Sequence, residues 1–160
     1  MDVDFDKLFS DISKMKVAVI GDVMLDTYWW GNVERISPEA PVPIVAVDKR
    51  EKRIGGAGNV ALNVRALGTK VALISILGDD EDGVQLKQLL LDNNIDTRFI
   101  LESKKRITTN KIRIISRNQQ MMRLDAEHTE EVDETDETKL QNQIEKYSLS
   151  EKPNVVILED

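Results

Sequence analysis

Three short apolar runs limit what this chain can fold into. Residues 17–20, 71–77 and 155–158 are almost wholly aliphatic. A strand that is buried on both faces has such a continuous pattern, whereas a strand with one solvated face alternates. Helical patterns at 59–67, 81–93 and 137–147 separate the runs. This order of strands and helices predicts an α/β fold in three layers, with a mainly parallel sheet.

The segment from Thr27 to Ile54 has a different pattern. Its residues are β-prone and partly alternate, and Pro38, Pro41 and Pro43 interrupt them. Alternation and proline are typical of antiparallel strands with a solvated side or edge. We therefore expect a small antiparallel β excursion at about 27–54, outside the central sheet. Further β segments are expected at 97–101, 108–116 and 120–125.

Composition narrows the class of protein. At 160 residues the chain can bury the core of one domain. It has no cysteine, no apolar run of about 18 residues and no basic-then-apolar leader at its N-terminus. These features favour a cytoplasmic protein without a membrane span. The net charge of −7 argues against nonspecific nucleic-acid binding.

A glycine-rich segment follows the excursion. Gly55-Gly56-Ala57-Gly58-Asn59-Val60-Ala61 precedes two further glycines, Gly68 and Gly78. A glycine pair permits positive φ and lets the backbone lie against a ligand, while Asn59 can open a helix and offer an amide to a hydroxyl. The alternative is a loop and helix start that binds nothing.

Asp26 is the first candidate ligand-binding side chain. It ends the segment from Gly21 to Asp26, just after the first apolar run. Open α/β sheets bind ligands at the carboxyl ends of their strands, and a carboxylate there can accept sugar hydroxyls. The alternative is a plain turn residue.

The ordered glycines from Gly55 to Gly78 resemble the first signature of the ribokinase-like (PfkB) carbohydrate kinases. Together with Gly21–Asp26 and Gly55–Asn63, the segments Arg35–Pro43 and Arg117–Asp125 resemble the branch that phosphorylates C1 of D-glycero-D-manno-heptose 7-phosphate, a step in ADP-heptose and lipopolysaccharide synthesis. The resemblance covers about Val17 to Asp160. It implies a ribokinase-like sandwich whose β lid, at about 27–54, closes on the sugar and pairs the subunits of a homodimer.

The resemblance also implies roles for single residues. Those expected to bind the sugar or its phosphate are Asp26, Gly55, Gly56, Asn59, Lys111, Arg113, Arg123 and Asp160. Lys111 and Arg113 share one strand face, and a guanidinium binds phosphate bidentately. A charged, solvated strand edge remains the alternative for these cations, and it is the favoured interpretation for Lys104, Lys105 and Arg106.

Two acidic segments, 79–83 and 125–137, could suggest metal sites. The first lacks the ligand order of a calcium loop, and the second has no glycine turn or ordered spacing. We interpret them as helix starts and a solvated linker, and expect no metal ligand.

In the resembled family, ATP and Mg²⁺ bind mainly through the second half of the kinase domain. The general base lies there as well, in a Gly-Ala-Gly-Asp motif that this sequence lacks. Ala57 also stands where ribokinases have Lys. We therefore expect the front portion of a kinase domain, inactive alone and without its catalytic residue. A non-catalytic sugar-binding or dimerisation fragment stays open. A dinucleotide-binding module is less favoured, because charged residues 48–53 precede its Gly56-x-Gly58-x-x-Ala61 pattern.

Overall fold

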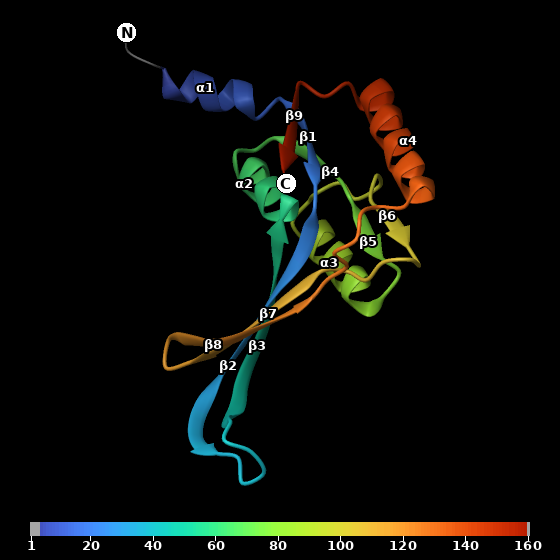
Figure 1. The fold of residues 1–160 in the computed structure, drawn as a ribbon. Helices are drawn as coiled ribbons and strands as arrows, with labels where there is room; N and C mark the ends of the chain where they lie inside the picture. The colour runs from blue at the N-terminus through green and yellow to red at the C-terminus, as the bar shows by residue number, and fades with distance from the viewer. Residues whose placement is uncertain (1–3, 160) are drawn as a thin grey trace.

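Three parallel strands form the centre of the fold. The computed structural model describes residues 4–159. β1 (Lys16–Gly21) lies between β4 (Lys70–Ile74) and β9 (Val155–Glu159), and it pairs in parallel with both. All three apolar runs contribute to this sheet, as Figure 1 shows. The predicted parallel sheet is therefore confirmed.

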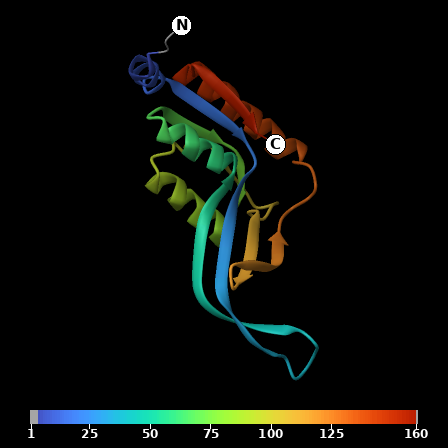
Figure 2. The ribbon, with the colours of Figure 1, turned by 90° about the vertical axis from the view of Figure 1, so that its left-hand side faces the viewer.

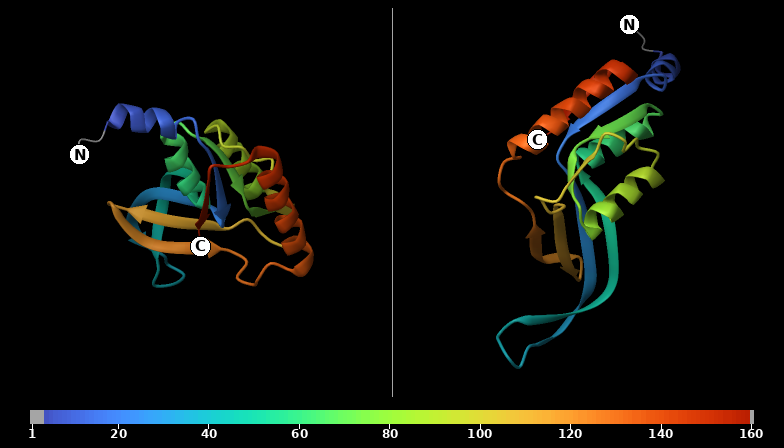
Figure 3. Two further views of the ribbon diagram at one scale, coloured as in Figure 1. Left: turned by 90° about the horizontal axis from the view of Figure 1, so that it is seen from above. Right: turned by 90° about the vertical axis from the view of Figure 1, so that its right-hand side faces the viewer.

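Helices cover both faces of this sheet. Val17 and Val19 of β1 pack with α2 (Ala57–Ala66) and α3 (Glu81–Asp92). Ala18, which points to the other face, belongs to a second cluster with α4 (Glu134–Glu151). The two faces are seen from other directions in Figure 3. β1 and β4 are apolar on both sides because each side is covered, whereas Val155, Val156 and Leu158 of β9 are exposed. The three-layer prediction is confirmed.

We call the central sheet and the helices that cover it the body. A second sheet extends away from it. Its order is β3 (Pro43–Gly56), β2 (Val23–Ile36), β7 (Asn110–Ser116) and β8 (Gln119–Ala126). The β2–β3 pair is antiparallel and long, and it curves outward in Figure 2. The expected excursion at 27–54 corresponds to most of these two strands and to the loop at 37–42 that joins them. We call the four strands the projecting sheet; β7 joins it through a parallel pairing with β2 that the antiparallel expectation did not include.

The expected single strand at 71–77 is wrong. β4 ends at Ile74, and β5 (Ile76–Gly78) pairs instead with β6 (Leu101–Ser103), which replaces most of the segment expected at 97–101. Buried Ser75 lies at the break. Its hydroxyl donates to the Gly21 carbonyl at 2.6 Å and accepts from the Val23 N–H at 3.3 Å. These bonds satisfy a polar side chain inside an apolar run.

Helix ends differ slightly from the expectation. α2 begins at Ala57 with Gly56 as its N-cap, so Asn59 does not open it. Gly68 follows the helix with φ +88°, as predicted for a C′ glycine. α4 is longer than the expected 137–147, and α1 (Phe5–Ile12) buries no side chain. Among residues 4–159, no helix is both long and apolar enough to cross a membrane.

Candidate functional site

The site begins where the chain leaves the central sheet. Asp22 is the single residue between β1 and β2, at the carboxyl edge of β1. Its carbonyl accepts the Ala57 N–H at 2.9 Å. Gly56 has φ +57°, and a Cβ there would lie 2.2 Å from the Asp22 carbonyl oxygen. Only glycine fits this junction, which brings the start of α2 beside the start of β2.

Strand register places five of the predicted residues on one side of the projecting sheet. Asp26 is opposite Arg53 on β3 and Lys111 on β7, and residues paired this way point to the same side. We call this side the charged face. Its members are Asp26, Tyr28, Trp30, Lys49, Glu51, Arg53, Gly55, Lys111, Arg113, Arg123 and Asp125.

The opposite side holds the projecting sheet to the body. Lys52 donates to Asp82 at 2.7 Å and to Gln85 at 2.6 Å, both on α3. Asn110 donates to Asp82 at 2.7 Å and accepts from Thr27 at 2.7 Å. Since this side packs on the body, the charged face points away from α3.

Asp26 and Arg113 form an ion pair on the charged face. The Arg113 Nη1 donates to Asp26 Oδ1, and only 22% and 21% of the two side chains is exposed. The hydrogen bond to Asp26 raises the pKa of Arg113. Gly55 leaves room for the carboxylate, because a Cβ there would lie 2.6 Å from Asp26 Oδ2. The structure thus brings three predicted residues into contact.

Aromatic rings lie among these charges. The Tyr28 ring has the guanidinium of Arg53 at 4.7 Å and that of Arg113 at 5.4 Å from its centroid. Trp30 stacks on Tyr28 at 5.4 Å. Hydrogen bonds from Arg53 and Lys49 lower the pKa of Glu51 to about 2. Sequence reasoning missed Arg53 and Tyr28; their even spacing from Gly55 and Asp26 was the available signal.

Two further predicted residues, Lys111 and Arg123, lie on β7 and β8. Half-buried Lys111 helps to line a cavity of about 150 Å³, together with Asp22, Met24 and His128. Arg123 is exposed on the outer strand β8 and pairs with Asp125 at 2.8 Å.

Asn59 and Asp160 are the remaining predicted residues. Asn59 is exposed on the first turn of α2, after the junction. Asp160 lies outside the described residues.

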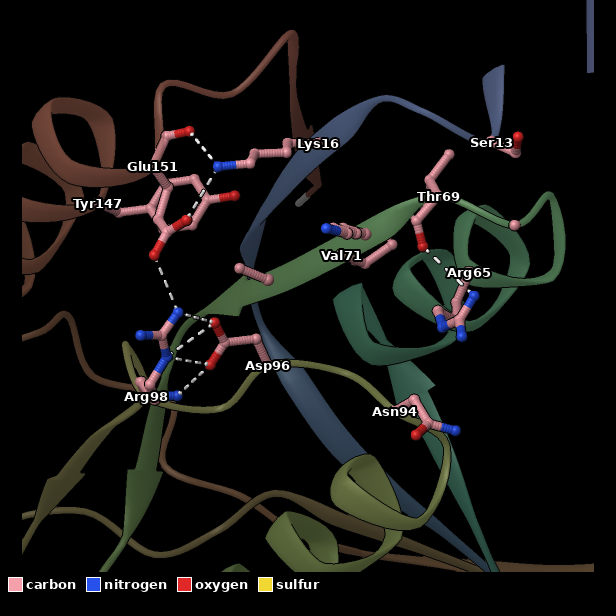
Figure 4. A pocket seen from close by; sticks show the side chains of 13 residues that line it. Ser13, Lys16, Arg65, Thr69, Val71, Asn94, Asp96, Arg98, Tyr147 and Glu151 are labelled. Atoms are coloured by element: carbon pink, nitrogen blue, oxygen red, sulfur yellow. Dashed lines mark hydrogen bonds and ion pairs between the residues drawn. The ribbon is translucent and has the colours of Figure 1, made fainter. Parts of the chain in front are cut away.

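A larger cavity, of about 400 Å³, lies at the amino edge of the central sheet (Figure 4). No predicted sugar or phosphate residue lines it. Lys16 pairs with Glu151 at 3.2 Å, and Arg98 pairs with Glu151 at 3.0 Å and with Asp96 at 2.6 Å. This network ties the end of α4 to the sheet, so we interpret it as structural.

Acidic groups within residues 4–159 do not form a metal centre. No three His, Cys, Asp or Glu side chains of this part of the chain gather closely enough to hold an ion. We therefore assign no step to a metal ligand in this region.

Known proteins resemble both the sequence and the fold. Residues 14–157 match the family described as pfkB family carbohydrate kinase. The bifunctional protein HldE of Geobacter sulfurreducens is 41% identical over 155 residues, which cover 97% of this chain and 31% of that protein. The D-beta-D-heptose 7-phosphate kinase of Bordetella bronchiseptica is 48% identical over 116 residues, covering 72% and 37%. The chain thus spans about a third of the length of these curated relatives.

Two solved structures show the same fold at lower identity. A carbohydrate kinase from Agrobacterium tumefaciens has a TM-score of 0.58 at 21% identity, covering 70% of this chain and 35% of that one. The Methanocaldococcus jannaschii nucleoside kinase, an archaeal member of the ribokinase family, has a TM-score of 0.54 at 18% identity, covering 70% and 36%. The predicted ribokinase-like fold is confirmed.

Proposed function

Because the chain belongs to the pfkB family of carbohydrate kinases, we propose that it forms the sugar-binding part of a heptose 7-phosphate kinase. In this proposal, a protein of the relatives' length that contains the chain, called here the whole kinase, transfers the γ-phosphoryl group of ATP. The acceptor is the C1 hydroxyl of D-glycero-D-manno-heptose 7-phosphate. The named Bordetella bronchiseptica relative supports the choice of sugar.

The charged face is the observation that carries the proposal. A sugar phosphate needs acceptors for its hydroxyl groups and cations for its phosphate. Asp26 supplies a carboxylate beside the glycine pair, while Lys111 and Arg123 supply cations on neighbouring strands. None of the ion pairs among residues 4–159 includes Lys111, which leaves its ammonium able to meet a phosphate.

We assign the sugar end to Asp26, Gly55, Gly56 and Asn59. Asp26 would accept hydroxyl hydrogen bonds, and the glycine pair would let the backbone approach the ring. The projecting sheet would close over the sugar by bending at Gly55-Gly56, which excludes water.

ATP and Mg²⁺ belong to the proposal as well. When bound, they would supply the phosphoryl group and neutralise its charge. We expect both to bind mainly through parts of the whole kinase outside residues 1–160. Within this chain, the residues named above bind and orient the acceptor. Sugar binding without transfer is the alternative, and the same experiment separates the two.

Phosphoryl transfer by the whole kinase tests the proposal. ADP release would be measured with heptose 7-phosphate, with the unphosphorylated heptose and with mannose 6-phosphate. We expect the highest kcat/KM for heptose 7-phosphate. A higher kcat/KM for an unphosphorylated sugar would contradict the phosphate assignment, and binding without ADP release would support the sugar-binding alternative.

A further inference from the structure

We propose that Arg113 is a positioning residue that holds the Asp26 carboxylate for the sugar, and that it does not bind the substrate phosphate. This inference rests on the proposed function and changes the role that the sequence suggested for Arg113. It concerns the same site but assigns the cations of the charged face to two different tasks.

The surroundings of Arg113 restrict its guanidinium. Nη1 bonds Asp26 Oδ1 and also donates to the Lys111 carbonyl at 3.4 Å. The ring of Tyr28 covers one side of the group. A guanidinium that turned toward a phosphate would leave the half-buried carboxylate of Asp26 without its partner, which is unfavourable.

The surroundings of Asp26 show what this pairing does. One oxygen, Oδ1, is held by Arg113, while the other, Oδ2, lies beside Gly55, where any side chain would collide. Arg113 thus fixes the plane of the carboxylate. Oδ2 is left to accept a hydroxyl at a defined position, and such preorganisation improves the orientation of an acceptor sugar.

Arg123 offers a contrast on the same face. Half of its side chain is exposed, and its partner Asp125 is on its own strand, two residues along the chain. It stands opposite Arg113 in the register, one strand further from Asp26. Arg123 can therefore meet a phosphate without disturbing Asp26, and it serves as the matched comparison.

The experiment compares two substrates that differ only in the phosphate. Wild-type whole kinase, R113Q and R123Q are assayed with heptose 7-phosphate and with unphosphorylated heptose. We expect R113Q to lower kcat/KM by about tenfold or more for both sugars, because an oriented hydroxyl contact is lost from each. R123Q should lower it only for heptose 7-phosphate.

A double-mutant cycle provides the second readout. Once Asp26 is already Asn, R113Q should cost less than about threefold, because the two residues act through one contact. R113K should recover part of the R113Q loss, since a lysine restores the charge without the planar guanidinium. Urea midpoints of each variant show whether the fold is intact.

Two results would overturn the inference. One is a loss with R113Q that is confined to heptose 7-phosphate, and the other is full additivity with Asp26→Asn. If the whole kinase phosphorylates neither sugar, the proposed function fails separately. Calorimetric binding of both sugars to wild type and R113Q then tests the pair, and equal affinities would overturn it.

Discussion

Asp26 and Gly55 depend on each other at the scale of single residues. The carboxylate occupies the space that a side chain at position 55 would take, and Arg113 holds its other oxygen. A substitution at any one of the three therefore changes the environment of the other two. Asp26 contacts both of the other residues, so substituting it is the most direct test of the site.

Replacing Asp26 with Asn tests that chemistry directly. Asn keeps the shape but loses the charge, so a charge-assisted hydrogen bond of about 1.5–3 kcal/mol is weakened. We expect kcat/KM of the whole kinase to fall at least about tenfold. The control is Asp11→Asn on α1, which pairs with Lys14 at 3.3 Å on the surface. Equal activity of wild type and the Asp26 variant would remove Asp26 from the site.

Gly56→Ala tests the junction between the two sheets. Alanine would be strained at φ +57°, and its Cβ would collide with the Asp22 carbonyl. We expect the free energy of unfolding to fall by roughly 1–3 kcal/mol, measured by urea denaturation. Asn63→Ala, at an exposed position of the same helix, should stay within about 0.5 kcal/mol of wild type. An unchanged midpoint for Gly56→Ala would contradict this account of the junction.

Sequence patterns singled out Asp26 as a candidate binding residue but did not predict its ion pair with Arg113. A carboxylate just after a buried strand is predictable, because the ligand edge of an α/β sheet is known. Arg113 lies 87 residues away and reaches Asp26 only through the parallel pairing of β2 with β7. No local pattern encodes that pairing, so the phosphate role suggested for Arg113 followed from the family resemblance, its charge and the strand face that it shares with Lys111.

At the scale of elements, the start of α3 connects distant segments. Asp80 caps the helix by accepting the Gly83 N–H at 2.7 Å, and it also accepts the Thr108 N–H at 2.7 Å. Thr108 lies two residues before Asn110, the first residue of β7. One carboxylate thus joins a helix of the body to the approach of the projecting sheet, and the helix-start interpretation of these acids is confirmed.

This carboxylate predicts a dependence of stability on pH. Burial raises the pKa of Asp80, but the hydrogen bonds from Thr108 and Gly83 outweigh it, so the pKa lies below its usual value. An unfolded Asp titrates near about pH 3.9. The carboxylate therefore stabilises the fold above that pH, and its contribution is lost as the pH falls through the lower folded pKa.

Asp80→Asn measures this contribution. Its unfolding free energy should lie about 1–2 kcal/mol below wild type at pH 7, and the difference should shrink as the pH is lowered toward 3. Asp79→Asn is the control, because that side chain is half exposed and lies 3.9 Å from Lys104. A difference for Asp80→Asn that stays constant with pH would rule out the charge as its cause.

Other elements show where sequence patterns reach their limit. The acidic segment 125–137 was interpreted as a linker and helix start, and Asp133 indeed caps α4. The break at Ser75 was not predicted, because one serine hardly alters an apolar run. Its cause is tertiary, since the hydroxyl bonds the distant Gly21 carbonyl and Val23 N–H.

At the scale of the whole molecule, the projecting sheet ends in exposed apolar residues. Ile36 is 60% exposed and Val42 is 51% exposed at the outer end of β2 and β3. Apolar groups gathered at the end of an extension suit contact with another protein surface. Family resemblance suggested pairing of two subunits through this region, and it remains a prediction.

Val42→Asp tests the predicted homodimer. A carboxylate buried between two copies would be unpaired, so we expect the variant to be monomeric where wild type is dimeric. Analytical ultracentrifugation of the whole kinase over a concentration series measures the mass. Leu149→Asp, at a 78% exposed position on α4, should leave the mass unchanged. A wild-type monomer at every concentration would contradict the prediction.

Residues 1–160 alone should transfer no phosphoryl group and bind sugar at most weakly. They carry the proposed sugar-side residues, but transfer also needs a general base and donors that stabilise the moving phosphoryl group. The Gly-Ala-Gly-Asp motif that would supply them does not occur in this sequence. ADP release by the 160-residue chain should therefore stay at background while the whole kinase turns over. Turnover by the purified chain that disappears in its Asp26→Asn variant would contradict this, because a contaminating kinase would not respond to that substitution.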